Sequence, residues 1–323
     1  MQPSHQPRKI GYRHASCAPW LALCTSLLMA CGPTASAEPH APVANAQTSP
    51  PPGVGFAILK TARRSVREGL LFDGGDFGKQ VETAFSAILV KHGEHYFLFD
   101  SGLGRDIARQ YNADMPWWRR LSFTYDDPVS PARAQLDAAH VPPIDRIVLS
   151  HAHWDHASGL TDFPGVEIWA SDPEMHMIHA ARSGAGSAWP SQVSSDSLQF
   201  RSLRFRDVPY EGFAQSLDLF DDGSVVLVPM YGHTPGSIGM FVRVDSGKRA
   251  FFVGDVVWNA GALAEGKPKF WLARSVVDQD AERTLATIGL IRGAMQRDPD
   301  LVVLPAHDGA AQAELGFFPH WIR

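Results

Sequence analysis

The chain has 323 residues, of which 45% are hydrophobic, and its 29 basic and 34 acidic side chains give a formal charge of −5. This length is enough for one large domain or two small ones. The chain has no basic stretch with interleaved aromatic residues, which argues against a nucleic-acid partner.

Residues 1–37 have the pattern of an export signal. Arg8, Lys9 and Arg13 form a basic stretch ahead of an apolar run, Trp20–Ala30, which is too short to span a bilayer comfortably. We therefore expect the mature protein outside the cytoplasm, either in the periplasm or anchored by a lipid to the cell envelope.

The sequence leaves two cleavage sites open. Leu28-Met29-Ala30-Cys31 resembles a lipoprotein box with Cys31 as the lipidated residue, whereas Ala35-Ser36-Ala37 resembles an ordinary signal-peptidase site. A single lipid-modified end would tether the protein without inserting it. A metal site in the mature protein would depend on histidine and carboxylate ligands, because all the cysteines lie in this early segment: Cys17, Cys24 and Cys31.

Residues 38–53 predict a spacer between the signal and the folded domain. They are rich in Pro, Ala, Ser and Gln and include Pro50-Pro51-Pro52. Such a composition cannot bury a core and is typical of flexible or polyproline-like linkers. We expect one folded domain over residues 54–323.

Within this domain, apolar and alternating runs predict strands, and helical spacing predicts the helices between them. The expected helices are Arg105–Tyr111, Pro131–Ala139, Asp172–Arg182 and Asp280–Gln296, and residues 183–199 are expected to form a loop. The expected strands are Gly55–Leu59, Ala84–Val90, His95–Phe99, Asp145–Ser150, Val166–Ala170, Ser224–Pro229, Ile238–Val244, Arg249–Val253 and Leu301–Leu304.

The last predicted helix has an N-cap candidate, Asp280, and an apolar face formed by Leu285, Ile288, Ile291 and Met295. Strands and helices follow one another in the same way in both halves of the chain. This order predicts an α+β fold in which two sheets pack face to face with helices outside.

Residues 112–131 form an irregular aromatic stretch that contains Trp117 and Trp118. It is either a surface loop that covers the core or a lid over a substrate pocket, since long ordered loops often have a function.

Metal-capable side chains follow four of the predicted buried strands. The segment Ser150–Gly159 alone holds three histidines and an aspartate, and buried groups of this kind must be paired or bound to a metal. Loops at strand ends are where sites are usually mounted. The candidate ligands are His151, His153, Asp155, His156, His233 in Gly232-His233-Thr234-Pro235-Gly236-Ser237, Asp255 and His307.

Seven ligands suit two metal ions. In one partition, three of them bind the first ion: His151, His153 and His233. A ligand set without thiolate favours Zn²⁺, with Mn, Fe or Co as alternatives. We expect Asp100 to orient a ligand histidine. The second ion would be bound by Asp155, His156 and His307, and the bridging carboxylate would be Asp255.

The series His-x-His-x-Asp-His, Gly-His-Thr-Pro-Gly-Ser, Gly-Asp and a late His resembles the metallo-β-lactamase superfamily in order and spacing, from about Val54 to the C-terminus. The resemblance implies a four-layer αββα sandwich with a dinuclear site at one edge between the sheets. It also implies metal-assisted hydrolysis by a bridging hydroxide. Asp155 and Asp255 would be the catalytic carboxylates, and Asp155 would also relay a proton to the leaving group.

Within the superfamily, Trp154, the helix at 280–296 and Ala306-His307-Asp308 resemble the N-acyl homoserine lactonases most. That group has a tyrosine three residues after the bridging aspartate, where this chain has Trp258. An indole N–H donates a hydrogen bond but cannot act as an acid. With Trp117 and Trp118, this residue suggests a small ester or lactone substrate with an apolar acyl group.

Three other functions stay open at this level. The β-lactamase subclass with only His and Asp ligands shares the Gly-His-Thr-Pro-Gly-Ser motif, although it does not normally depend on a bridging aspartate. The chain could also be an exported metal-binding protein without hydrolytic activity, or an iron-dependent, oxygen-using member of the fold. Glyoxalase II shares the metal motifs but has a basic glutathione-binding tail that this sequence lacks.

Overall fold

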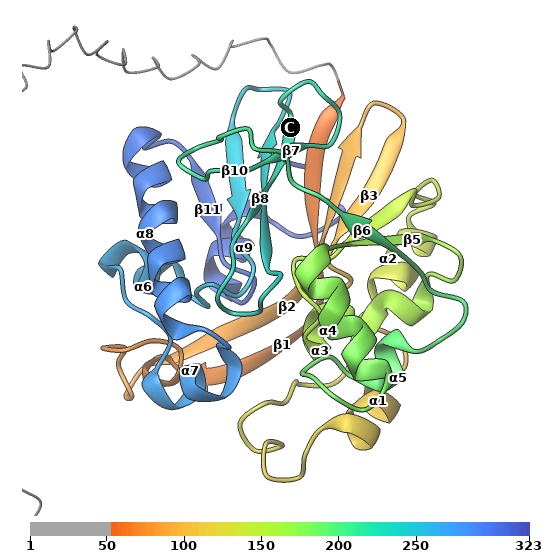
Figure 1. Ribbon diagram of the computed structural model, residues 1–323, viewed down its shortest axis with the longest axis vertical. Coiled ribbons are helices and arrows are strands. Elements are labelled where there is room, and N and C mark those ends of the chain that lie inside the picture. The colour runs from red at the N-terminus through yellow and green to blue at the C-terminus, as the bar shows by residue number, and fades with distance from the viewer. Residues whose placement is uncertain (1–52) are drawn as a thin grey trace, which may run out of the picture. The chain divides into compact units, whose positions relative to one another are not determined.

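The computed structural model describes residues 53–323 (Figure 1). The expected export signal, the lipoprotein box and all but the last residue of the spacer lie outside these residues. Over residues 53–323, no helix combines the length and the apolar character needed to cross a membrane.

The first sheet has six strands in the order β1-β2-β3-β4-β5-β6. Strands β1 to β3 pair antiparallel, and β3 to β6 pair parallel. Gly93, with a φ of 58°, makes the tight turn between β2 and β3. The strands are β1 (Val54–Arg67), β2 (Gln80–His92), β3 (His95–Phe99), β4 (Arg146–Val148), β5 (Glu167–Ser171) and β6 (Gln199–Leu203).

The second sheet has five strands in the order β11-β10-β9-β8-β7. Only β10 and β11 pair parallel, and the other neighbours pair antiparallel. The strands are β7 (Leu217–Asp218), β8 (Val225–Pro229), β9 (Ile238–Arg243), β10 (Arg249–Phe252) and β11 (Val302–Leu304).

Helices connect these strands and cover the sheets. Two are short 3-10 helices, η1 (Glu68–Leu70) and η2 (Ser158–Asp162). The α-helices are α1 (Ile107–Asp114), α2 (Ala132–Ala138), α3 (Trp154–Ala157), α4 (Asp172–Arg182), α5 (Pro190–Val193), α6 (Ala260–Glu265), α7 (Trp271–Val277), α8 (Ala281–Arg297) and α9 (Gly309–Leu315).

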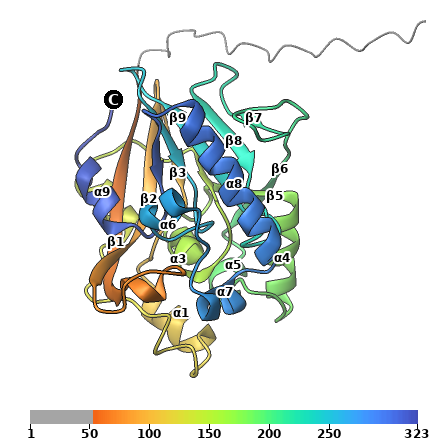
Figure 2. The ribbon, with the colours of Figure 1, turned by 90° about the vertical axis from the view of Figure 1, so that its left-hand side faces the viewer.

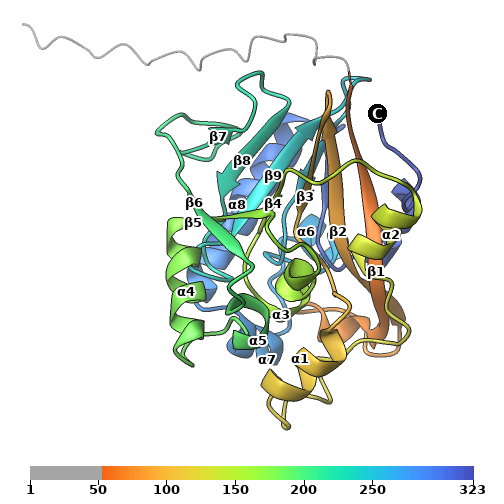
Figure 3. The same ribbon diagram turned by 90° about the vertical axis from the view of Figure 1, so that its right-hand side faces the viewer.

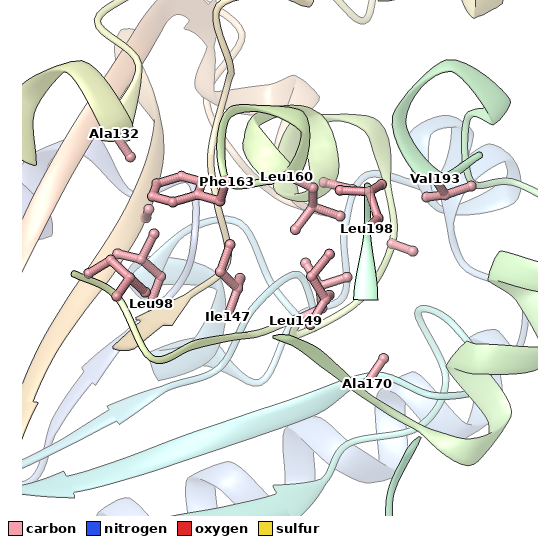
Figure 4. Packing of buried hydrophobic residues seen from close by; sticks show 14 of the residues in the cluster. Leu98, Ala132, Ile147, Leu149, Leu160, Phe163, Ala170, Val193 and Leu198 are labelled. Carbon is pink, nitrogen blue, oxygen red and sulfur yellow. The ribbon is translucent and has the colours of Figure 1, made fainter. Parts of the chain in front are cut away.

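Three apolar clusters define four layers. Phe56, Phe97 and Phe252 belong to the cluster between the two sheets. Leu98, Ile147 and Leu149 on the outer face of the first sheet pack under α2, α4 and η2 (Figures 3 and 4). Val228, Phe241 and Phe251 on the outer face of the second sheet pack under α8 and α6 (Figure 2). The predicted αββα sandwich is confirmed.

Several elements differ from the expectation. Strand β1 continues to Arg67, and its last five residues alternate between exposed and half-buried. The expected loop at 183–199 contains α5, and β6 begins at Gln199. These elements are short or largely exposed, so they lack the apolar periodicity that makes a strand or helix visible in a sequence.

The apolar face of α8 differs from the predicted one at Leu285. Asp280 caps it as expected, because its side chain accepts a hydrogen bond from the backbone N–H of Arg283. Leu285 is 49% exposed, however, whereas Ile288 and Ile291 are buried. The buried stripe also includes Thr284, Thr287 and Ala294, which turns Leu285 towards solvent.

Two substitutions on α8 should therefore behave differently. Ile291→Ala removes a fully buried side chain over the second sheet and should lower the free energy of unfolding by about 2–5 kcal/mol. Leu285→Ala should change it by less than about 0.5 kcal/mol, because that side chain faces solvent. Urea denaturation of both variants checks this, and equal losses would contradict the described packing.

Candidate metal centre

The seven predicted ligands meet at one edge of the sandwich, between the two sheets. The segment after β4 contributes four of them, two from its loop and two from α3, and the loops after β8, β10 and β11 contribute one each. They form two adjacent groups that could each hold a metal ion, the first with His151, His153 and His233, the second with Asp155, His156, Asp255 and His307.

In the first group, three imidazole nitrogens face one another. The His233 Nε2 lies 2.8 Å from the His153 Nδ1 and 3.2 Å from the His151 Nε2. Nitrogens bound to one tetrahedral zinc ion are about 3.3 Å apart, given Zn–N bonds of about 2.0–2.1 Å. The three nitrogens are therefore spaced as ligands of a single ion.

In the second group, two imidazoles face two carboxylates. The His307 Nε2 lies 3.1 Å from an oxygen of Asp155 and 3.1 Å from the Asp255 Oδ1. The His156 Nε2 lies 3.2 Å from the same Asp255 oxygen. This set of nitrogen and oxygen donors also suits a small divalent cation.

Asp255 reaches both groups. Its Oδ1 belongs to the second group, while its Oδ2 lies 3.6 Å from the His233 Nε2 of the first. The indole N–H of Trp258 donates a hydrogen bond to the same Oδ2 at 2.9 Å, which holds the carboxylate in this orientation. The geometry suits the predicted bridging position.

The outer nitrogen of most of these histidines is held by a neighbour. The Nδ1 of His156 lies 2.7 Å from Asp100, that of His233 2.7 Å from Asp278, and that of His307 2.8 Å from the carbonyl oxygen of Ala84. Such contacts orient the ring and leave Nε2 free for a metal. His153 is the exception, since its Nδ1 faces the site.

Asp100 has the orienting role that the sequence suggested. Besides contacting His156, it accepts hydrogen bonds from the backbone N–H of Ser150 at 2.7 Å and the Ser150 hydroxyl at 2.8 Å. The Ser150 hydroxyl also lies 2.9 Å from the His151 Nδ1. One buried carboxylate thus supports the start of the histidine-rich loop and two of its rings.

The residues present fit metal ions on a further observation. Among the described side chains, the His156 Nε2 and the Asp255 Oδ1 are buried without a hydrogen-bond partner. Buried polar atoms are rarely left unpaired, because each costs about 1–3 kcal/mol. A cation between them would satisfy both atoms.

The two groups differ in protonation. Burial and the neighbouring imidazoles lower the pKa of His151 and lower that of His153 to about 3. Burial and the Lys269 ammonium lower the pKa of His233, so all three rings are neutral at pH 7. Burial also opposes protonation of His156 and His307. The nearby carboxylates outweigh it, raising the pKa of His307 to about 10 and that of His156 well above its usual value.

Sequence reasoning missed Glu174 of α4, which ties together two ligand-bearing loops. This fully buried carboxylate accepts hydrogen bonds from the backbone N–H of Ala152 at 2.6 Å and the hydroxyl of Thr234 at 2.6 Å. Burial raises its pKa to about 7. A Cβ at Gly236 would lie 2.2 Å from the Glu174 backbone nitrogen and would clash with it. This explains why the motif has a glycine at this position.

A buried ion pair behind His233 was also missed. The Lys269 ammonium is fully buried and lies 2.7 Å from the Asp278 Oδ1, the oxygen that contacts the His233 Nδ1. Burial alone would raise the pKa of Asp278, but Lys269 and His233 have the larger combined effect and lower it below its usual value. The carboxylate therefore remains ionised. No motif surrounds these two residues, and a lone Lys or Asp in a sequence usually indicates a solvated surface.

A largely apolar pocket of about 670 Å³ opens above the metal-capable groups. His153, Asp155, His233, Asp255 and His307 line its inner end. Two of the three predicted substrate residues, Trp118 and Trp258, line the pocket. The third, Trp117, does not line it and is 82% exposed. The 112–131 stretch covers the core through Phe123 and Tyr125 and also forms part of the pocket wall.

Removing the charge behind His233 should weaken metal binding. Asp278→Asn keeps the shape of the side chain but leaves Lys269 without its counter-charge and His233 without its carboxylate. We expect the affinity of the first group for zinc to fall about 10- to 100-fold, as measured by competition with a chromophoric chelator. Asp300→Asn, an exposed change, serves as the control. Unchanged affinity in Asp278→Asn would rule out this orienting role.

Metal binding should also release protons. Because the pKa of His156 and His307 lies above neutral, both rings are protonated at pH 7 in the metal-free protein and must lose their protons to bind. The first group is already neutral. Calorimetry in buffers of different ionisation enthalpy should detect about two protons released per chain, and affinity should rise with pH towards about 10. Affinity independent of pH between 6 and 9 would contradict this assignment.

Comparison with known proteins agrees with this geometry. A probable metallo-hydrolase of Mycobacterium tuberculosis is 29% identical over 194 residues, covering 51% of this chain and 55% of the relative. The chain therefore spans about half the length of the curated relatives it matches.

Solved structures share the fold. An N-acyl homoserine lactone hydrolase with the product N-hexanoyl-L-homoserine at its catalytic metal centre aligns with a TM-score of 0.63 and 15% identity, over 83% of this chain and 98% of that one. A dizinc quorum-quenching lactonase aligns with a TM-score of 0.52 and 16% identity, over 78% and 86%.

The family model described as the metallo-beta-lactamase superfamily matches residues 84–307, a span that contains all seven metal-capable residues of the two groups. The match covers more than half of the chain. The chain belongs to the metallo-beta-lactamase superfamily.

Proposed function

We propose that the chain is an exported, dinuclear zinc-dependent hydrolase that cleaves an ester or lactone with an apolar acyl group. One observation carries the proposal: two adjacent metal-capable groups share Asp255 at the inner end of a largely apolar pocket. Export rests on the pattern of residues 1–37 alone. The lactonase neighbours support the reaction class, since a product and two zinc ions are named for them.

The proposed ligands divide as the two groups do. His151, His153 and His233 would hold one ion and Asp155, His156 and His307 the other, with Asp255 between them. Two metal ions in such a site supply a hydroxide at neutral pH and polarise the carbonyl oxygen. The protein's own contribution is to hold these seven side chains in place and to exclude bulk water around them.

The proton relay is assigned to Asp155. It borders the pocket, and although burial raises its pKa, the adjacent His156 and His307 lower it below the usual value. It is therefore ionised and can accept a proton before passing it to the leaving group. Trp258 does not take this role, because its N–H is donated to Asp255 and an indole is not an acid at neutral pH.

The pocket supports the proposed substrate class. Its wall contains Met115, Trp118, Phe123 and Leu272, side chains that suit an apolar acyl chain extending away from the metal-capable groups. The volume of about 670 Å³ is within the range of small-molecule sites.

Asp255→Ala tests the two-metal assignment. Loss of the bridging carboxylate should remove one metal equivalent and reduce kcat/KM on lactones or esters by at least about 100-fold. Metal analysis and a hydrolysis assay, with the exposed Asp207→Ala as the control, measure both quantities. Full activity in Asp255→Ala would refute the bridging role. Iron in the purified protein together with oxygen consumption would favour an oxygen-using enzyme instead.

Trp118→Ala tests the acyl pocket. Because Trp118 lines the pocket, its truncation should raise KM about tenfold for long acyl chains and leave short-chain substrates almost unchanged. Trp117→Ala is the matched neighbour that does not line the pocket and should have little effect on any chain length. An equal effect of Trp118→Ala on every chain length would contradict acyl binding at this wall.

A further inference from the structure

Large apolar side chains are exposed at one place far more than elsewhere on the described residues. Ten such side chains are at least 40% exposed, and seven of them lie in three segments. We call these seven the apolar rim: Leu70, Phe77, Trp117, Trp118, Leu121, Trp271 and Leu272.

The three segments lie next to one another around the mouth of the pocket. The rings of Phe77 and Phe270 are 5.7 Å apart, and the backbone N–H of Trp271 donates to Asp73 at 2.9 Å, which joins the first segment to α7. Leu70, Trp118, Leu121 and Leu272 all line the pocket. Figure 1 shows α7 and the loop after α1 at the same end of the molecule.

Helix α7 leaves its apolar side chains only partly covered. Its sequence, Trp-Leu-Ala-Arg-Ser-Val-Val, is largely apolar, yet none of its residues is buried. On the opposite segment, Trp117 is 82% and Leu121 90% exposed. Exposed apolar side chains gathered around one pocket mouth usually mark a contact with another surface.

The rim also has an excess of positive charge. Residues 115–124 contain Arg119 and Arg120 but no acidic residue. Neither arginine forms an ion pair with any residue of the described chain, and the Arg119 guanidinium lies over the Trp118 ring at 4.6 Å. Among the acidic side chains of the other segments, Glu68 lies 2.8 Å from Lys79 and Asp73 lies 3.7 Å from Arg274, whereas Asp76 accepts a hydrogen bond from the backbone N–H of Gly78.

We propose that the apolar rim docks on an anionic lipid surface. Tryptophan and arginine are side chains that settle at the boundary between lipid and water, and cationic residues beside them are attracted to anionic headgroups. A folded partner or a second copy seated on the rim would close the pocket, because the rim surrounds its mouth. A lipid surface would instead open the pocket to apolar molecules dissolved in it.

Vesicle co-sedimentation of the full chain tests the docking surface, with Cys31→Ser in every sample so that lipid attachment cannot contribute. Trp117→Ser combined with Trp271→Ser should lower the partition coefficient on phosphatidylglycerol vesicles at least tenfold. The control is Val208→Ser with Leu290→Ser, which removes two exposed apolar side chains outside the rim. It should bind as the parent does.

Charge is tested separately. Arg119→Gln with Arg120→Gln should weaken binding about fivefold for each arginine removed and flatten its dependence on salt, with little effect on neutral phosphatidylcholine vesicles. Circular dichroism confirms that each variant is folded. Equal binding of the rim and control variants would overturn the proposal. A dimer in sedimentation velocity that only the rim variants abolish would overturn it too. Neither readout depends on hydrolysis, so failure of the proposed activity would leave this result intact.

Discussion

A single buried carboxylate, Asp255, links the two halves of the site and the two sheets that carry them. Its Oδ1 faces the imidazoles of His156, after β4, and His307, after β11, whereas its Oδ2 faces the imidazole of His233, after β8. Seven buried or half-buried polar groups in one place would be costly without compensation. The proposed cations supply that compensation, so metal binding should also hold the two sheets together at this edge.

Behind the proposed ligands, a second set of side chains decides how they point. Asp100 supports the histidine-rich loop, Glu174 ties it to the loop of His233, and Lys269 balances the charge of Asp278. All four lie in the interior and come from different segments. The metal-capable edge is therefore built into the packed core rather than added by a flexible loop, which suits a site that needs fixed geometry.

The proposed ligands could be predicted from the sequence because each follows a buried strand whose apolar run is visible, and strand ends on one edge of a sandwich must meet. Glu174, Lys269 and Asp278 could not, since their partners lie far along the chain or carry no motif. Leu285 was wrongly placed on the buried face of α8, because helical spacing of apolar residues does not by itself show which of them face the core. Strand β6 and helix α7 were missed because both are largely exposed, so no apolar pattern marks them.

Anomalous diffraction from zinc-loaded crystals tests most directly whether Asp255 holds two metal ions together. Two peaks are expected, one among His151, His153 and His233 and the other among Asp155, His156 and His307, with the Asp255 carboxylate between them. A single peak, or two peaks with Asp255 turned away from one of them, would contradict it.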